Sequence, residues 1–347
     1  MTKESLIQPY GIAADNNFYM TNHQDLIFVP EVELRDNQRM AEENPVRVEV
    51  ERAVAKVVVS GVPEVVPHGD RIDNLKWGLD VTNMYTYWMR KMTFIANSGG
   101  VPNEMEQLNA GYREERYAED PNFTRFSSWN GGNPVGQFEY LSGTPELSKN
   151  FDDYDYTLEN TMDAADQRHD VTTRVVISGT YTPNGFGSVA TRNGGGISFY
   201  YFKGNAIRVE AMRDMVNDRG QIPQELRDAG LEQAIENVLA WNPNAFNSPT
   251  VSFSEGGIHF YYQGVCYYTV LIRHFSNNMV PVLMGYGRYG VVRNNVYQLS
   301  INKIIGPGQP VINPPGTDPD DEDTSWISAD VNIMRWYIRN QNVEELL

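Results

Sequence analysis

The C-terminal tail, residues 326–347, constrains the fold of this chain more than any other stretch. In its sequence, WISADVNIMRWYIRNQNVEELL, apolar and polar residues alternate from Ile327 to Ile333. Side chains alternate between the two faces of a strand, so this period of two predicts a β-strand with one face to bury. After Ile333 the alternation changes phase, which predicts a bulge or bend at Ile333–Met334. A strand at the end of a chain needs a sheet to join, either in its own molecule or in a neighbour.

The segment before the tail, GPGQPVINPPGTDPDDEDTS, is rich in proline and then strongly acidic. Its clustered acids repel one another in water, so we expect a solvated linker at residues 318–325. A calcium loop is disfavoured, because the run lacks the glycine at its sixth position and the glutamate at its twelfth. Residues 307–325 would then act as a hinge that gives the tail its reach.

The rest of the chain predicts a mainly β protein with many short strands. Residues 46–59 form the clearest strand, with a break in its alternation near Arg52, and Pro63 and Pro67 mark a boundary after it. Further strands are expected at 172–183, 197–207, 251–275 and 291–305. The spacing of apolar residues predicts one helix at 221–241. Two β-sandwiches with a helical insertion fit this pattern, divided as an N-terminal domain (1–62), a C-terminal domain (63–317) and the linker with its tail (318–347).

Composition limits the function and the compartment. The formal net charge is −17, which argues against binding nucleic acid through electrostatic attraction. Cys266 is the single cysteine, so the chain has no internal disulfide, and we expect a buried thiol in a strand. No apolar stretch is long enough for a spanning helix, and the polar start shows no signal peptide. We therefore expect a cytosolic protein or the mature form of an exported one.

No motif in the sequence indicates an enzyme, a metal site or a cofactor. The five histidines are scattered, and His259 and His274 could meet only through the fold. Nucleophile elbows, phosphate-binding loops and dinucleotide fingerprints are missing. A glycoside hydrolase needs only two carboxylates at a set separation, but no pair of acids here has a spacing that distinguishes it.

Several segments together resemble the type V fimbrial subunits of Bacteroidales, the fimbrillins of the minor-fimbria type. The similar segments are VEVERAVAKVVV (48–59), DYTLENTM (155–162), TTRVVISGTYTP (172–183), VCYYTVLIRHF (265–275), YGVVRNNVYQLSINKIIGPGQPV (289–311) and VNIMRWYIRNQNVEEL (331–346). They follow one another in the order of the family. The short N-terminal part departs from the family, and no lipid-anchor signal, removable first strand or cleavage arginine is identifiable.

The resemblance implies two transthyretin-like, Greek-key β-sandwich domains in a lipoprotein exported to the cell surface. An arginine-specific protease would remove the first strand, and the C-terminal strand of the next subunit would fill the groove that this opens. The chain would thus be a fimbrial stalk subunit whose partners are copies of itself and accessory tip and anchor subunits, with surface receptors possible. The donor-strand side chains would be Ile327, Val331, Ile333, Met334, Trp336, Ile338 and Val343.

The alternative function is a glycan-binding lipoprotein or adhesin on the same scaffold, because exposed aromatic rings can stack on sugars. The aromatic residues that could serve are Trp77, Tyr85, Tyr87, Trp88, Tyr112 and Trp129. Aromatic residues in strands belong more often to the core. A tip adhesin would also be expected to lack a donor tail, so the stalk subunit is favoured.

Overall fold

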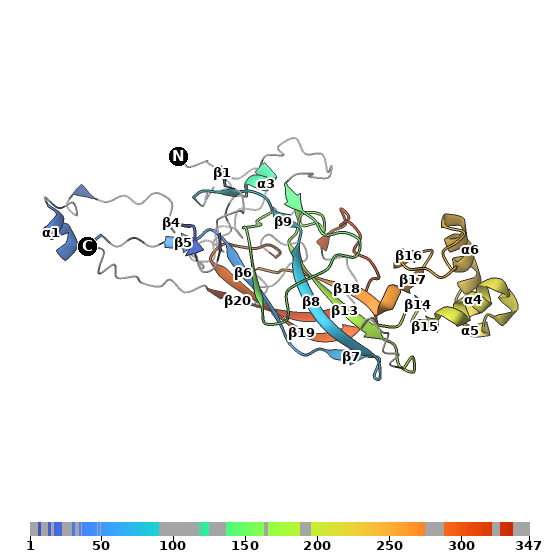
Figure 1. Cartoon of the computed structure of the whole chain (residues 1–347). Coiled ribbons are helices and arrows are strands. Elements are labelled where there is room, and N and C mark those ends of the chain that lie inside the picture. The colour runs from blue at the N-terminus through green and yellow to red at the C-terminus, as the bar shows by residue number, and fades with distance from the viewer. Residues whose placement is uncertain are drawn as a thin grey trace.

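The computed structural model describes residues 50–89, 137–162, 166–187, 196–274, 288–320 and 327–335, with shorter stretches between residues 6 and 48 and at 118 and 120–124. The chain is mainly β, as predicted, and the helices α4, α5 and α6 lie together at one end (Figure 1). The centre of the molecule is a β-sandwich of a five-stranded and a three-stranded sheet.

The five-stranded sheet has the order β12–β6–β19–β20, and β7 pairs with β19 beyond the end of β6. Its strands are β6 (Ala55–Ser60), β7 (Glu64–Val66), β12 (Tyr154–Thr157), β19 (Asn295–Ile305) and β20 (Ile327–Arg335). The three-stranded sheet has the order β18–β13–β8, formed by β8 (Arg71–Asp80), β13 (Arg174–Thr182) and β18 (Val265–Leu271). Pairing is antiparallel except for β6 and β7, which both run parallel to β19.

The core lies between these two sheets and takes alternate side chains from each. In β6 every second residue is buried, and Val57 and Val59 face Val175 and Ile177 of β13 across the interior. Each fully buried aliphatic side chain of this kind stabilises the fold by about 1.5–3 kcal/mol. Trp77 is completely buried and donates its Nε1–H to the carbonyl of Asn150 at 2.8 Å.

The predicted boundary at 62–68 falls inside the larger sheet, because β6 and β7 pair with the same edge of β19. Strand β6 therefore belongs to the central sandwich, although the sequence division placed it in the N-terminal domain. Gly61 joins the two strands with a φ of +111°, and a Cβ there would lie 2.5 Å from the carbonyl oxygen of Ile301. Only glycine allows the chain to turn this closely against β19.

A helical lobe extends from the sandwich at the end opposite β4, β5 and α1 (Figure 1). Its sheet, in the order β15–β14–β17–β16, consists of β14 (Phe199–Phe202), β15 (Asn205–Arg208), β16 (Phe253–Glu255) and β17 (Ile258–Tyr261). Its helices are α4 (Val209–Asn217), α5 (Gln224–Asp228) and α6 (Leu231–Trp241), with short 3₁₀ turns at Arg219–Gln221 and Tyr262–Gly264. The lobe has an apolar core of its own that joins the helices to the sheet.

The helix predicted at 221–241 is two helices in the structure, and α4 was not predicted. Gly230 lies between α5 and α6 with a left-handed φ of 90°, which ends one helix and changes the direction of the next. The apolar spacing continues across this break, so the sequence pattern resembled one helix.

Short elements complete the described chain. The paired strands are β1 (Leu6–Ile7) with β10 (Thr86–Tyr87), β2 (Ala13–Ala14) with β3 (Asn17–Phe18), β4 (Met20–Asn22) with β5 (Val50–Arg52), and β9 (Thr82–Asn83) with β11 (Phe138–Glu139). The helices are α1 (Gln38–Glu43) and α3 (Pro121–Thr124). The predicted break near Arg52 is confirmed, since β5 ends there and β6 begins at Ala55.

Candidate functional site at the C-terminal edge strand

The first part of the tail, β20, lies on the sheet of its own molecule. It pairs antiparallel with β19, from Ile327 opposite Ile304 to Arg335 opposite Asn295. Ile327, 6 % exposed, is buried in the sandwich core. The partly buried Ala329, Val331 and Ile333 pack against the same core. Alternate residues face solvent, so the strand has one apolar and one polar face, as its sequence predicts.

The bend predicted at Ile333–Met334 is not in the structure. The register continues regularly through these residues, and Met334 lies on the outer face, 42 % exposed. The irregularity is instead in β19 between Ile301 and Lys303, where one additional residue, Asn302, stands opposite the start of β20. Asn302 Nδ2 donates to Asp330 Oδ2 at 2.7 Å across the two strands. The other expected donor residues, Trp336, Ile338 and Val343, lie outside the described residues.

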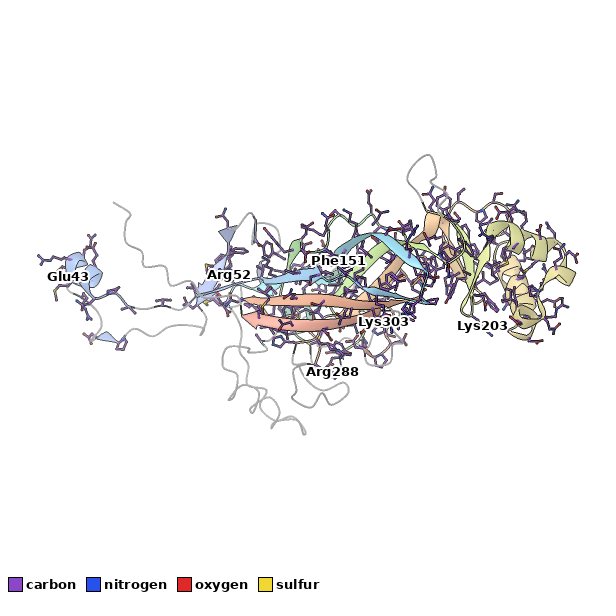
Figure 2. The ribbon with its side chains drawn as sticks, turned by 90° about the horizontal axis from the view of Figure 1, so that it is seen from below. Glu43, Arg52, Phe151, Lys203, Arg288 and Lys303 are labelled. Carbon is purple, nitrogen blue, oxygen red and sulfur yellow. The ribbon has the colours of Figure 1, made fainter. Side chains whose placement is uncertain are left out.

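β20 is an edge strand. Its one partner among the described strands is β19, so along its other side no described strand accepts or donates main-chain hydrogen bonds. Such an edge is a template for pairing with a further chain. Figure 2 shows β19 and β20 running side by side along the sandwich, with Lys303 near the end of β19 that faces the lobe.

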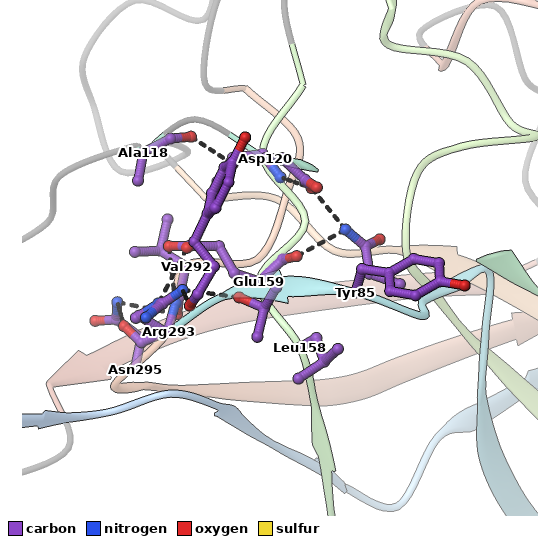
Figure 3. A network of polar contacts seen from close by, with 12 residues as sticks. Tyr85, Ala118, Asp120, Leu158, Glu159, Val292, Arg293 and Asn295 are labelled. Atoms are coloured by element: carbon purple, nitrogen blue, oxygen red, sulfur yellow. Dashed lines mark hydrogen bonds and ion pairs between the residues drawn. The ribbon is translucent and has the colours of Figure 1, made fainter. Parts of the chain in front are cut away.

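A buried polar network holds the beginning of β19 (Figure 3). Arg293, fully buried, pairs with the Glu159 carboxylate at 3.0 Å and donates to Thr86 Oγ1 at 2.7 Å. The Glu-Asn-Thr and Arg-Asn segments of the fimbrillin resemblance thus meet in space. Because a buried charge is costly without its partner, this pair fixes the start of β19 relative to the segment that follows β12.

Asp120 extends the same network. Its carboxylate accepts hydrogen bonds from Asn83 Nδ2 at 2.6 Å, from the main-chain N–H of Thr161 at 3.0 Å and from Asn122. Burial raises the pKa of Asp120 to about 7, with a smaller contribution from the nearby Glu159 charge, while the bonds from Asn122 and Thr161 act in the opposite direction. Each of these bonds joins two parts of the chain to each other, so the network acts as a structural clamp.

The connector after β19 packs against the sandwich as far as Asp320, so the expectation of a solvated linker is wrong at this residue. Asp318 is exposed, as expected, and residues 321–325 lie outside the described residues. Tyr268 and Tyr261 donate their hydroxyls to the carbonyls of Gly306 and Gly308 at 2.9 and 2.6 Å. Asp320 is 3 % exposed and accepts a hydrogen bond from Thr172 Oγ1 at 2.6 Å. The acidic run looked uniformly solvated in sequence, but a hydroxyl partner distant in the chain stabilises one of its acids.

The four described residues among the aromatic residues proposed for sugar stacking are buried or partly buried. Trp77 and Tyr87 are buried, and Tyr85 and Trp88 are partly buried, with Trp88 packed on Tyr19 at a ring distance of 4.0 Å. Tyr112 and Trp129 lie outside the described residues. Trp77 and Tyr87 therefore belong to the interior and are not available for stacking on a sugar.

The candidate catalytic and metal-binding residues are also separate. His259 contacts Ser254 Oγ at 2.9 Å, whereas His274 contacts the Tyr297 hydroxyl at 2.6 Å. Burial raises the pKa of Cys266 to about 12, so the thiolate needed for nucleophilic attack is disfavoured. No group of three or more potential metal ligands occurs in the described part of the chain.

Sequence comparison connects this site with a family. Residues 259–342, which contain β18, β19, the connector and β20, match the sequence model described as major fimbrial subunit protein type IV, fimbrillin, C-terminal. The fimbrillin resemblance is confirmed over this segment. A search of curated proteins gave no match.

Solved structures with a similar chain course include a fimbrilin from Porphyromonas gingivalis, at 17 % identity and a TM-score of 0.38, covering 85 % of this chain and 61 % of that one. A candidate cell-adhesion protein from Parabacteroides distasonis has 13 % identity and a TM-score of 0.32, with 85 % and 61 % covered. One from Bacteroides eggerthii has 12 % identity and a TM-score of 0.29, with 83 % and 57 % covered. The chain thus spans about 61 % of the length of the first of these proteins.

The helices in the described part of the chain are too short or too polar to cross a membrane.

Proposed function

We propose that the protein is a non-enzymatic structural subunit of a cell-surface fimbria. In this proposal the tail of one subunit pairs with a neighbouring subunit. The single observation that carries the proposal is a terminal edge strand with one apolar face, within the segment that matches the fimbrillins. Partners are further copies of the chain and accessory subunits at the tip and the anchor.

The chemistry of β20 suits such an exchange. A strand that moves from its own sheet to an equivalent edge in a neighbour makes the same main-chain hydrogen bonds and buries the same apolar face. The exchange therefore costs little free energy at equilibrium. Because the donor and acceptor surfaces differ, each subunit can bind one neighbour with its tail and receive another, and repeated head-to-tail contacts build a filament.

Two surfaces of a neighbouring subunit could accept the tail, one suggested by the described structure and one by the family resemblance. One is the β19 edge that a neighbour exposes when its own β20 leaves. The other is a groove opened elsewhere by removal of an N-terminal strand. Both require the tail, and they differ in whether β20 itself must leave β19.

Deletion of residues 327–347 tests the proposal. We expect the truncated protein to remain folded, because the two sheets keep their buried core, and to stay monomeric under conditions in which the full chain forms fibres. Electron microscopy and sedimentation velocity, with and without trypsin-like cleavage, provide the measurement. Fibres formed by the truncated protein would refute strand exchange through the tail.

A matched pair of substitutions separates the apolar face from the strand as a whole. Val331→Asp places a charge on the face that packs against the core, whereas Asn332→Asp places the same charge on the exposed face. Burying an unpaired carboxylate costs several kcal/mol, so Val331→Asp should abolish fibres and Asn332→Asp should keep them. Equal behaviour of the two variants would contradict a role for the buried face.

A further inference from the structure

A hollow of about 530 Å³ lies where the helical lobe meets the sandwich. The last residue of α6, Trp241, forms part of its wall, together with the loop before β16 and Val311 of the connector. Hollows of this size hold small ligands. The fimbrial assembly proposed above does not use this region of the molecule.

Trp241 is 53 % exposed, whereas the apolar residues Leu231, Ile235 and Val238 on the same helix are buried. The ring packs against Phe253 of β16 at a centroid distance of 5.4 Å and an interplanar angle of 45°. This contact holds the indole in place and leaves much of its surface to solvent. A fixed, half-exposed indole can stack on the apolar C–H face of a sugar ring with little loss of side-chain freedom.

Polar groups that can hydrogen-bond to hydroxyls surround the indole. Asn242 and Asn244 line the hollow with Thr250. The amide oxygen of Asn242 accepts from the main-chain N–H of Asn244 at 3.0 Å, and that of Asn244 accepts from Asn247 at 3.3 Å. These bonds orient both amides and leave N–H groups of Asn242 and Asn244 as donors.

The charge of the lining residues indicates which class of ligand the hollow can bind. Its lining is made of Trp241, Asn242, Asn244, Ala245, Pro249, Thr250, Val251, Ser252, Phe253, Ser254 and Val311, none of which is charged. In a chain with a net charge of −17, such an uncharged wall suits a neutral ligand rich in hydroxyls. An acidic ligand would find no cation in the lining to pair with.

A second hollow of about 460 Å³ shares Thr250, Val251 and Ser252 with the first, and Lys76 and Glu146 are among its other lining residues. We call the two hollows together the Trp241 groove; its uncharged wall is the part next to Trp241. From these features we propose that the Trp241 groove binds a neutral oligosaccharide, with one ring stacked on the indole and its hydroxyls bonded to the amides of Asn242 and Asn244. This site is distinct from the aromatic residues expected from the sequence and does not depend on strand exchange.

A glycan array that contains neutral oligosaccharides, such as cellohexaose, maltohexaose and chitohexaose, together with acidic glycans, tests the proposal on the full chain. We expect binding to neutral members and, in isothermal titration with the strongest of them, a loss of affinity of roughly tenfold or more for Trp241→Ala. Trp241→Phe should restore part of the affinity, because a smaller aromatic face remains.

Tyr154→Ala is the matched control, since Tyr154 is also exposed, at 41 %, but lies on β12 of the sandwich. It should bind the same oligosaccharide as strongly as the unchanged protein. The proposal is overturned if no neutral oligosaccharide binds, or if Trp241→Ala binds as well as the control. It is also overturned if Trp241→Ala changes only self-association in sedimentation velocity, which would make the patch a contact between subunits.

Discussion

At the scale of single residues, the buried charges show most clearly how distant segments are held together. Arg293 and Glu159 are 134 positions apart in the chain, and both are almost completely inaccessible to water. Dehydrating two such groups costs several kcal/mol each, and the cost is offset only while the pair and its hydrogen bonds stay intact. The pair therefore favours one arrangement of these segments, because any other arrangement would leave a buried charge without its partner.

Arg293→Met tests this view. Removal of the guanidinium leaves the Glu159 carboxylate buried without its cation, so we expect the free energy of unfolding to fall by about 3–5 kcal/mol. Chemical denaturation followed by circular dichroism gives the value. Lys149→Met is the control, because Lys149 and Asp155 are 3.7 Å apart and both 37 % exposed, and it should cost less than about 1 kcal/mol. Similar losses in the two variants would contradict the assignment of Arg293 as a clamp.

The residue pattern predicts which side chains are buried in strands, but not which polar residues join them. Val57, Val59 and Leu299 follow from alternation alone, since a strand with one polar face places them inside. Nothing near Arg293 in the sequence indicates that it lies in the interior, because Glu159 is supplied by a different part of the fold. The sequence also does not decide where Trp77 lies, because an aromatic side chain suits both a protein core and a surface that stacks on sugars.

At the scale of elements, the connector from Gly306 to Asp320 determines how much of the tail can move. It crosses from β19 to the other sheet, where Gln309 and Tyr267 exchange two main-chain hydrogen bonds of 2.9 and 2.8 Å. Asp320 then fixes it to Thr172. The part of the chain that leaves during strand exchange should therefore begin after Asp320.

Asp320→Ala measures the strength of this attachment. Loss of the carboxylate leaves the buried Thr172 hydroxyl without that acceptor, so we expect the free energy of unfolding to fall by about 1–3 kcal/mol. Hydrogen exchange of the amides in residues 309–320 should become faster. Asp318→Ala, two positions away in the same acidic run and exposed, should change stability by less than about 0.5 kcal/mol. Equal exchange rates in the two variants would show that the connector is held elsewhere.

At this scale some local sequence patterns fit two different structures, and the pattern alone does not decide between them. Apolar spacing across Gly230 fits one helix or two, and the left-handed φ of that residue decides in favour of two. Met334 makes the tail seem to change phase, yet it is an apolar residue on an exposed face. Strict alternation does predict strands such as β6 and β19, because one face of each strand is buried and the other is not.

At the scale of the whole molecule, the fold is elongated, with the lobe at one end and β20 along the side of the sandwich (Figures 1 and 2). Alternation in the sequence predicts that the tail must join a sheet, but it contains no information on whose sheet. The structure places β20 on its own β19, which defines the state from which exchange would begin. In that state β20 covers one edge of β19, so a neighbour that paired with this edge in the proposed exchange would have to compete with an intramolecular strand.

A disulfide between β19 and β20 distinguishes the two acceptors proposed above. Gln298 and Asn332 are register partners on the outer face, and directly opposed residues of antiparallel strands lie about 4.5–5.5 Å apart at Cα, within the range of a disulfide. In Gln298→Cys/Asn332→Cys, oxidation should therefore hold β20 in its own molecule. Cys266 is completely buried with its pKa raised by burial, so it should not compete for the new thiols.

If β20 must leave β19, the oxidised double variant should stay monomeric in sedimentation velocity and electron microscopy, and reduction should restore fibres because the strand is released. Asn332→Cys alone, treated with the same oxidant, should polymerise throughout. Fibres formed by the oxidised double variant would show that residues 327–335 remain on their own sheet during assembly. Exchange would then be confined to residues 336–347, and the acceptor would be a groove other than the β19 edge.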